Sequence, residues 1–459
     1  MKRLLSVLAL VLVLVNVSCT KDESNMTVLV EKAYVYTLPL MMMDATDVKM
    51  TNTVEPTNMQ APSNRLIHAV NLATHESKDV VTPNVDTYYS QIYMDLSQDA
   101  LVVELPATER YCMAQILDAW TNCLSCVHAT DFETDSSLVC ITGPSFAGDV
   151  PSEMIHVKSP TSLAWMIVRT LSNGISENDP QIAAIQSKMK TYTLTGYLDG
   201  QKTCDNKGTF NPENNYVPVR KVLTMTPEEY FRKANELMVA NPPAEADKEI
   251  LAELKKINVG PGLEFNIAVL PENVREGWTG MVSDIINICL KKSASFIKFN
   301  GHWSYYSKPI AEFGTEYYYR SLIAVAGLGA NPVSQAIYPK TEVDVDSLRL
   351  NGQNCYVLHF DAGQLPETEE HGFWSITLYD ESNFLVENPI GRYCINDRDE
   401  LVFNEDGSLD IFIQNEPYED CMANWLPAPA EDFHLHLRVY KPTERVLSNA
   451  WPMPQVKRR

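Results

Sequence analysis

The chain has 459 residues, of which 45% are hydrophobic, so it can bury sizeable cores and divides into two or three domains. Its formal net charge is −22, which leaves no basic field to offset the phosphates of a nucleic acid. The charge therefore argues against a nucleic-acid partner and suits a soluble protein of the cell envelope or exterior. No P-loop, glycine-rich dinucleotide motif, zinc-protease motif or nucleophile-elbow serine is present, and we expect no cofactor.

The N-terminus has the features of a targeting segment. Lys2 and Arg3 precede an apolar run from Leu4 to Val15, shorter than the roughly 20 residues that span a bilayer. The run closes on small residues and then Cys19, an order that resembles a bacterial lipoprotein signal. That resemblance implies that residues 1–18 are a signal peptide and that Cys19 is lipidated. We expect an envelope lipoprotein of the outer membrane, periplasmic or surface-exposed; an ordinary cleaved secretory signal is the alternative.

The cysteines carry one motif-like spacing. Ten cysteines less Cys19 leave nine, an odd number that implies at least one free thiol in an oxidising compartment. Cys123 and Cys126 have the spacing of redox motifs. However, no βαβ pattern surrounds them, and residues three apart in a regular strand point to opposite faces. We therefore interpret both as small core residues.

The first part of the chain predicts one helix followed by β-structure. Apolar residues recur at helical spacing from Thr27 to Met50, where Pro39 should kink the helix or split it. After an irregular stretch, short strands without intervening helices predict antiparallel pairing in a β-rich domain over residues 27–180. The expected strands are Gln91–Asp95, Leu101–Leu105, Tyr111–Ala119, Leu138–Thr142 and Leu163–Thr170.

A helical connecting section is predicted over residues 181–330. Thr226 can cap a helix, Pro227 suits its first position, and Glu229 closes a capping box. Further helices are expected at Ala244–Ile257, Val274–Lys292 and Thr315–Ala326.

Residues 331–459 return to a β-pattern and predict a C-terminal β-sandwich domain. Asn351-Gly352 signals a turn, and Asp406-Gly407 signals a hairpin that joins strands at 401–403 and 409–413. The fold class is therefore α+β, with two mostly antiparallel, jelly-roll-like β-sandwich domains joined by the helical section.

Two strands of this domain alternate between apolar and polar positions. In a strand, successive side chains point to opposite faces, so the mainly apolar residues lie on one face and the mainly polar residues on the other. One face can then enter a core while the other lines a cavity. In the first strand, Trp374, Ile376 and Leu378 alternate with Phe373, Ser375, Thr377 and Tyr379. In the last clear strand, Phe433, Leu435, Leu437 and Val439 alternate with His434, His436, Arg438 and Tyr440.

Several segments in fixed order resemble a known pair of domains. Residues 33–39, 83–90 and 117–122 resemble the domain of unknown function numbered 1254. Residues 373–377, 388–393, 406–409, 424–429 and 438–442 resemble its usual C-terminal companion, numbered 1214. The resemblance spans nearly the whole mature chain. It implies two sandwich-like domains joined by helices in exported bacterial proteins, and it brings neither an established activity nor a set of catalytic residues.

The first candidate site lies in the N-terminal β-rich domain. Its members combine carboxylates, an amide and aromatic rings, which can act as acid or base or bind a sugar hydroxyl. The alternative is that the amide and the first carboxylate only stabilise a tight turn after Pro83. The candidates are Asn84, Asp86, Tyr88, Asp118 and Trp120.

The second candidate site lies in the C-terminal domain and comprises Trp374, Tyr379, Arg392 and Tyr393. Arg392 can bind a carboxylate or phosphate through two parallel hydrogen bonds, or it can hold a loop in place by donating to backbone carbonyls. Both interpretations stay open.

The third candidate is the pair His434 and His436. Two histidines separated by one residue on a strand begin many jelly-roll metal sites, but the sequence locates neither the carboxylate nor the third histidine. We therefore expect no metal and keep the pair as the only weak candidates for ligands.

These patterns predict an exported lipoprotein of unknown activity that binds a small molecule in an aromatic and polar pocket, where its domains meet. Whether it is an enzyme stays open. The alternatives are a non-catalytic cell-surface interaction or scaffold protein and a metal-dependent jelly-roll enzyme. The expected partners are the membrane, through Cys19, and a small molecule. A homo-oligomer is left open.

Overall fold

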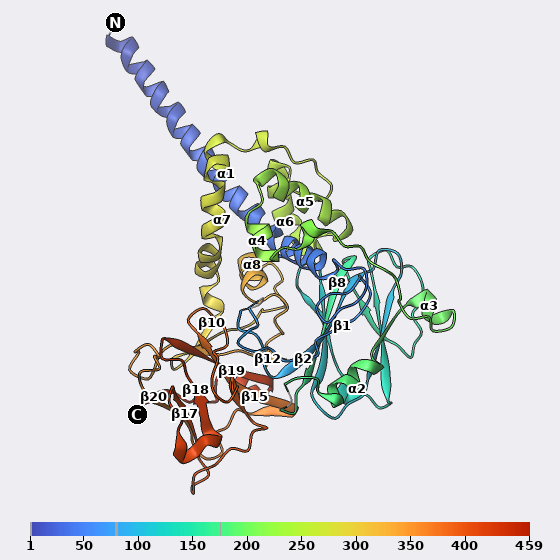
Figure 1. Ribbon diagram of the computed structural model, residues 1–459. Coiled ribbons are helices and arrows are strands. Elements are labelled where there is room, and N and C mark those ends of the chain that lie inside the picture. Colours follow the sequence, from blue (N-terminus) through green and yellow to red (C-terminus); the bar gives the residue numbers. More distant parts are fainter. Residues whose placement is uncertain (1, 79–80, 175) are drawn as a thin grey trace.

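The computed structural model describes residues 2–78, 81–174 and 176–459, and of residues 2–24 it describes only the helical backbone. The predicted signal peptide and Cys19 thus lie outside the residues whose side chains are described. In Figure 1 one sandwich lies on the right, a second at the lower left, and most helices above them. Among the described side chains, no helix is both long and apolar enough to cross a bilayer.

The N-terminal sandwich consists of two sheets that face each other across one apolar core. Buried side chains from both sheets, such as Ile116 and Met166 against Val103 and Val139, form this core. The first sheet has the order β1 (Ile67–His68), β2 (Thr87–Asp95), β8 (Leu163–Leu171), β4 (Cys112–Asp118), β5 (Cys123–His128). The second has the order β7 (Ile155–Lys158), β6 (Ser136–Thr142), β3 (Leu101–Pro106), β9 (Lys190–Thr193).

The helical layer is built around α1 (Lys2–Met50), which packs against the helices that follow it along the chain. Those helices are α4 (Pro218–Leu223), α5 (Pro227–Ala240), α6 (Lys248–Leu254), α7 (Glu272–Lys292) and α8 (Tyr317–Ala326). The predicted capping box at Thr226 and Glu229 is confirmed at the start of α5. Three short helices lie elsewhere: α2 (Pro180–Lys188), α3 (Leu194–Leu198) and α9 (Glu444–Leu447).

Pro39 does not split α1, which runs through it as one helix. A proline lacks the N–H that would bond the carbonyl four residues earlier, here that of Val35. The Ser321 hydroxyl of α8 donates to this carbonyl, so a neighbouring helix satisfies the group that the proline leaves free. The cost of the proline is thereby reduced, and the two helices are fixed against each other.

The C-terminal sandwich also has two sheets. One has the order β10 (Ile297–Asn300), β11 (Trp303–Tyr306), β13 (Lys340–Thr341), β19 (Phe433–Pro442), β15 (Thr368–Asp380), β16 (Cys394–Asn396), with β12 (Ala336–Ile337) also on β19. The other has the order β18 (Trp425–Pro427), β17 (Leu409–Gln414), β14 (Tyr356–Phe360), β20 (Val456–Arg458). Apart from β6 with β7 and β17 with β18, the paired strands are antiparallel, which confirms the α+β prediction.

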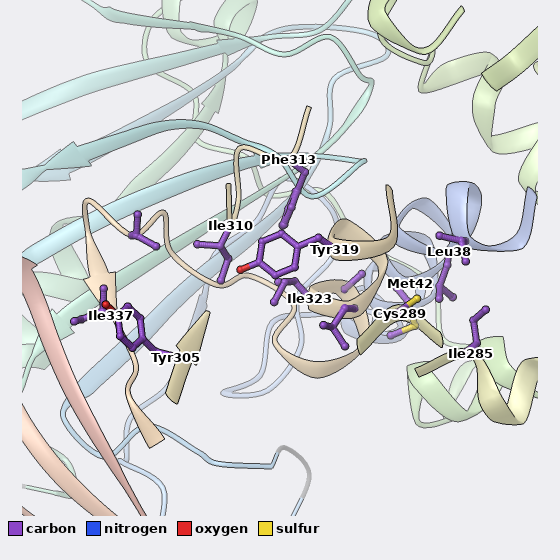
Figure 2. Close-up of a cluster of buried hydrophobic side chains, with 14 of the residues drawn as sticks. Leu38, Met42, Ile285, Cys289, Tyr305, Ile310, Phe313, Tyr319, Ile323 and Ile337 are labelled. Carbon is purple, nitrogen blue, oxygen red and sulfur yellow. The ribbon is translucent and has the colours of Figure 1, made fainter. Parts of the chain in front are cut away.

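The core of this sandwich continues without a break into the helical layer. Figure 2 shows the connecting part, where Met42 of α1 and Cys289 of α7 lie beside Ile323 of α8, and Tyr305 and Ile337 extend the cluster toward the sheet. The core of the N-terminal sandwich forms a separate cluster. The helices and the C-terminal sandwich therefore share one apolar core.

Two details differ from the sequence prediction. Residues 401–403 form no strand, because the Asn424 side chain takes the place of a partner strand and bonds both backbone groups of Val402. In addition, some elements lie outside the domain that the sequence predicted for them. The helix α1 packs in the helical layer, although residues 27–50 belong to the predicted N-terminal domain. Two parts of the predicted helical section join sheets instead, because β9 pairs in the first sandwich and β10 and β11 pair in the second. The boundaries themselves stay a prediction.

Candidate functional site

The polar faces of β15 and β19 lie side by side and form one surface. The two strands pair so that Ser375 lies opposite Arg438, Thr377 opposite His436, and Tyr379 opposite His434. The alternate residues Trp374, Ile376 and Leu378 are buried in the apolar core, as the period of two predicted. The polar surface faces residues 82–86, which immediately precede β2 in the N-terminal sandwich.

Asp86 makes the central polar contact between residues 82–86 and the C-terminal sandwich. Its side chain is 0% exposed, and its two carboxylate oxygens accept hydrogen bonds from the Ser375 hydroxyl at 2.6 Å and from Arg398 Nη2 at 3.0 Å. Arg398 also lies over the ring of Phe373, with 5.0 Å between the guanidinium carbon and the ring centroid. Asp86 is thus a buried ion-pair partner between the two sandwiches, and both of its oxygens are occupied.

Asn84 makes both the turn that was predicted and a contact between the sandwiches. Its Oδ1 accepts hydrogen bonds from the backbone N–H groups of Asp86 at 2.6 Å and Thr87 at 3.2 Å, which closes a tight turn. Its Nδ2 donates to the Tyr440 hydroxyl of β19 at 2.7 Å. One amide therefore shapes the turn and binds it to the opposite sandwich.

Arg438 and Tyr379 extend the contact. Arg438 donates to the hydroxyls of Thr377 at 2.7 Å and Tyr379 at 2.6 Å, and to the backbone carbonyl of Thr82 at 3.2 Å. Tyr379 in turn donates to the backbone carbonyl of Pro83 at 2.7 Å. Both side chains are buried, so Arg438 makes its hydrogen bonds out of water, where they are strong.

A cleft of about 210 Å³ opens at the end of this surface, beside His434. His434 is buried and its ring stacks on Tyr379, with centroids 5.6 Å apart. Within the described part of the chain, Nε2 of His434 and Nε2 of His436 are buried without a hydrogen-bond partner. Burial lowers the pKa of His434 to about 4, so the ring is neutral at neutral pH and can accept a hydrogen bond at its unprotonated nitrogen. The cleft is lined by Lys340, Glu342, Arg349, Leu350, Glu381, Asn383, Asp432, Phe433 and His434.

The remaining C-terminal candidates lie away from the cleft lining. Arg392 donates from Nη1 to the backbone carbonyls of Met422, Ala423 and Trp425 at 2.8–3.1 Å. It therefore holds a loop in place, which is the second of the two alternatives predicted for it. The Tyr393 hydroxyl lies 2.9 Å from Nδ1 of His75 and so links the two sandwiches again.

Asp118 and Trp120 occupy a different place, where the N-terminal sandwich meets the helical layer. Asp118 accepts backbone hydrogen bonds from Trp120 and Asn122 at 2.9 Å, and burial raises the pKa of its carboxyl. Arg320 of α8 is buried over the Trp120 ring, with 5.2 Å between the guanidinium carbon and the ring centroid.

Tyr88 is buried in β2, where burial raises the pKa of its hydroxyl to about 12. The ligand-binding roles of Tyr88, Asp118 and Trp120 stay predictions.

Sequence reasoning missed two arginines that join the parts of the molecule. Arg398 lies in a polar turn after β16, where nothing in its neighbours points to Asp86. Arg169 lies inside the apolar strand β8, is buried, and donates to Gln115 at 2.8 Å and Asn331 at 2.9 Å. A charge within an apolar strand is the one signal that could have revealed Arg169, because buried charges require dedicated partners.

Replacing Arg398 with Met should lower the free energy of unfolding by about 3–5 kcal/mol, because it leaves the Asp86 carboxylate buried without its ion partner. Urea unfolding at neutral pH measures the loss. As a matched control, Arg349→Met changes a side chain that is 70% exposed, and stability should change by less than about 0.5 kcal/mol. Equal effects of the two substitutions would contradict the buried-pair description.

The free energy of unfolding should fall as the pH drops from about 6.5 toward 4. The folded state holds His434 with a pKa of about 4, whereas the unfolded chain titrates it near 6.5, so only the unfolded chain gains the proton in this window. His434→Gln should therefore reduce the pH dependence measured by urea unfolding at pH 7 and 5, and the remainder comes from other buried histidines such as His68 and His436, whose pKa values are also lowered by burial. The exposed control His371→Asn should leave the slope unchanged, and a slope equally unchanged in His434→Gln would refute the assignment.

Comparison with known proteins matches two segments of the chain to family models. Residues 63–193 match the model of a protein of unknown function, DUF1254, and residues 335–444 match DUF1214. The crystal structure of VPA0106 from Vibrio parahaemolyticus is similar over 94% of this chain and 99% of that chain, with a TM-score of 0.67 and 19% identity, which is a likeness of fold. A structure from Burkholderia cenocepacia covers 93% of this chain and 87% of its own, with a TM-score of 0.44 and 10% identity. Curated proteins gave no match. The chain belongs to the family of proteins in which a DUF1254 domain precedes a DUF1214 domain.

Proposed function

We propose that the protein is a lipid-anchored envelope protein that binds a small polar molecule in the cleft beside His434. The observation that supports this proposal is the unpartnered Nε2 of His434, a buried acceptor or donor at a cleft of about 210 Å³. A buried polar atom without a partner costs free energy, so its retention is explained if a bound molecule satisfies it.

The charges of the cleft indicate which groups are available to a ligand. Lys340 pairs with Glu342 at 2.6 Å, and Asp432 accepts a hydrogen bond from Asn351 at 2.7 Å. Glu381 is exposed and has no hydrogen-bond or ion-pair partner among the described residues. Arg349 lies 3.8 Å from Asp432, and the side chain of Asn383 has no hydrogen-bond partner among the described residues. The acceptors left for a ligand are therefore the carboxylate of Glu381, the ring of His434 and the amide oxygen of Asn383.

The carboxylate of Glu381 and the ring of His434 favour a ligand with hydroxyl or ammonium donors. A carboxylate only accepts hydrogen bonds, and a neutral imidazole accepts one at its unprotonated nitrogen. The net charge of −22 also attracts cations and repels anions. We therefore infer a small hydroxylated or amine-bearing molecule, and the proposal covers binding whether or not turnover follows.

The membrane anchor is proposed from the N-terminal segment. Among the residues whose side chains are described, Met26 and Leu29 are the first that pack on the helical layer, so the polar segment 20–25 would link it to a lipid on Cys19. Six helical residues of α1 rise about 9 Å, which would hold the helical layer close to the membrane. In Figure 1 the N-terminal half of α1 extends away from the rest of the molecule.

A second candidate function is a non-catalytic interaction or scaffold protein. It is favoured by the use that the chain makes of Asn84, Asp86 and Tyr379, whose polar groups all connect the two sandwiches. A metal-dependent enzyme has less support, because no group of three or more His, Cys, Asp or Glu side chains among the described residues is arranged to hold an ion. Elemental analysis of the purified protein tests that alternative directly.

Glucosamine, which carries both hydroxyls and an ammonium group, is a suitable first probe for the cleft, with glucose and putrescine separating the two features. Titration calorimetry should show saturable binding of at least one probe, weakened at least tenfold (about 1.4 kcal/mol) by combined His434→Gln and Glu381→Gln. The exposed control Glu405→Gln should bind as the wild type does. Absence of saturable binding by all three probes would count against the proposal, and so would unchanged affinity in the double variant.

Lipidation can be tested separately in bacteria that express the full chain. Metabolic labelling with an alkyne fatty acid should mark the wild-type protein and the control Cys355→Ser, and both should sediment with membranes. Cys19→Ser should lose the label, because the thiol is the only acceptor that the signal pattern provides. An unlabelled, soluble wild-type protein would instead support an ordinary cleaved secretory signal.

A further inference from the structure

Cys123 and Cys126 lie on the same face of β5, contrary to the expectation for residues three apart in a regular strand. The pairing of β5 with β4 explains this, because Gln115 lies opposite Cys126 and Leu117 opposite Cys123, while Leu124 has no opposite residue. Leu124 is therefore the extra residue of a β-bulge. Gln115 and Leu117 share one face of β4, so the bulge turns both cysteines to the same side of the sheet.

The two thiols are in contact. Their Sγ atoms are 3.5 Å apart, and Cys123 Sγ also lies 3.5 Å from the backbone carbonyl of Ser125. Both side chains are half-buried on β5, an edge strand of its sheet, so small reagents can reach them. No other pair among the cysteines that the structure describes is recorded in contact.

We propose that Cys123 and Cys126 form a redox-active dithiol that a disulfide-bearing oxidant converts into an intrachain disulfide. A disulfide requires sulfur atoms about 2.05 Å apart, so a movement of about 1.5 Å closes the bond. A bulge on an edge strand has room for such a movement, because no second strand pairs with the other side of β5 in its sheet.

The reaction is a pair of thiol–disulfide exchanges. The Cys123 thiolate attacks one sulfur of the oxidant, forms a mixed disulfide and releases the first thiol. The thiol of Cys126 then loses its proton and attacks Cys123 Sγ, which forms the Cys123–Cys126 bond and releases the second thiol. One disulfide is reduced to two thiols while the protein dithiol loses two electrons and two protons.

The surroundings assign the attacking role to Cys123. The contact with Cys126 lowers the pKa of the Cys123 thiol, and the same contact, together with burial, raises the pKa of Cys126. The charged groups that act on the pair are Arg169, which favours the thiolate form, and Glu312, which opposes it. A lowered thiol pKa in a partly exposed site is typical of the first cysteine of a redox pair.

The position of the pair shows what its oxidation would affect. The backbone N–H of Cys123 donates to the carbonyl of Ala311 at 2.7 Å, and His128 Nε2 lies 2.7 Å from the side-chain oxygen of Gln335. β5 therefore connects the N-terminal sandwich to the two segments that flank α8 and lead to strands of the C-terminal sandwich. A disulfide across the bulge would tighten the strand at this connection.

The test uses the purified full-length protein in mixtures of reduced and oxidised glutathione, quenched with an alkylating reagent and analysed by peptide mass spectrometry. The expected result is a peptide that has lost two hydrogens and links Cys123 to Cys126, formed in a single two-electron transition. Cys355, an exposed cysteine, serves as the internal control and should carry only a glutathione adduct.

Two variants separate the roles. In Cys126→Ser, the Cys123 adduct with glutathione should persist, and it should form at least tenfold faster than the Cys126 adduct in Cys123→Ser. The proposal is overturned if Cys123 and Cys126 remain unlinked while Cys355 in the same sample is fully modified. Because that comparison is made within the wild-type chain, it holds even where a variant fails to fold.

Discussion

The contact between the two sandwiches depends on the buried carboxylate of Asp86. Asp86 lies between the two sandwiches with no exposed side-chain surface, and it is held by the Ser375 hydroxyl and the Arg398 guanidinium. Transfer of an unpaired carboxylate from water into a protein interior costs several kcal/mol, so the contact is stable only when both partners are in place. Each partner comes from a different part of the C-terminal domain. The correct docking of the sandwiches and the pairing of Asp86 are therefore the same event.

The contact between the sandwiches is polar, whereas the cores on either side of it are apolar. The helical layer and the C-terminal sandwich share one continuous core, whereas the N-terminal sandwich has its own. Between them, Asn84, Tyr379 and Arg438 align donors and acceptors at distances of 2.6–3.2 Å. Hydrogen bonds require a defined direction, so such a surface specifies one relative orientation more strongly than an apolar surface of the same size.

The cleft beside His434 follows from the same arrangement. β19 presents four polar or aromatic side chains on one face. Arg438 and Tyr440 bond the N-terminal sandwich, whereas Nε2 of His434 and Nε2 of His436 have no hydrogen-bond partner among the described residues. The proposed binding site is thus the continuation of the docking surface. This relation explains why the residues that suggested a ligand site also hold the sandwiches together.

Much of the fold could be predicted because it is encoded locally. The alternation of Phe373 through Tyr379 fixed which side chains enter the core, and Thr226 with Glu229 fixed the start of α5. Contacts between distant segments could not be predicted, because periodicity shows which face is polar but not what it meets.

Three examples show this limit. Asp86 and Asp118 are similar carboxylates in sequence, yet one pairs with Arg398 and the other caps a local turn near Arg320. The bulge at Leu124, which reverses the expectation for Cys123 and Cys126, depends on pairing with β4. Pro39 was expected to kink or split α1; the helix is not split, and the Ser321 hydroxyl that bonds the carbonyl left free by Pro39 comes from a helix that follows much later in the chain.

The most direct test of the central claim is differential scanning calorimetry of the intact protein at neutral pH. If the Asp86 contact joins the sandwiches into one cooperative unit, a single transition should appear whose calorimetric and van't Hoff enthalpies agree. Two resolved transitions in the wild-type protein, one for each apolar core, would contradict it.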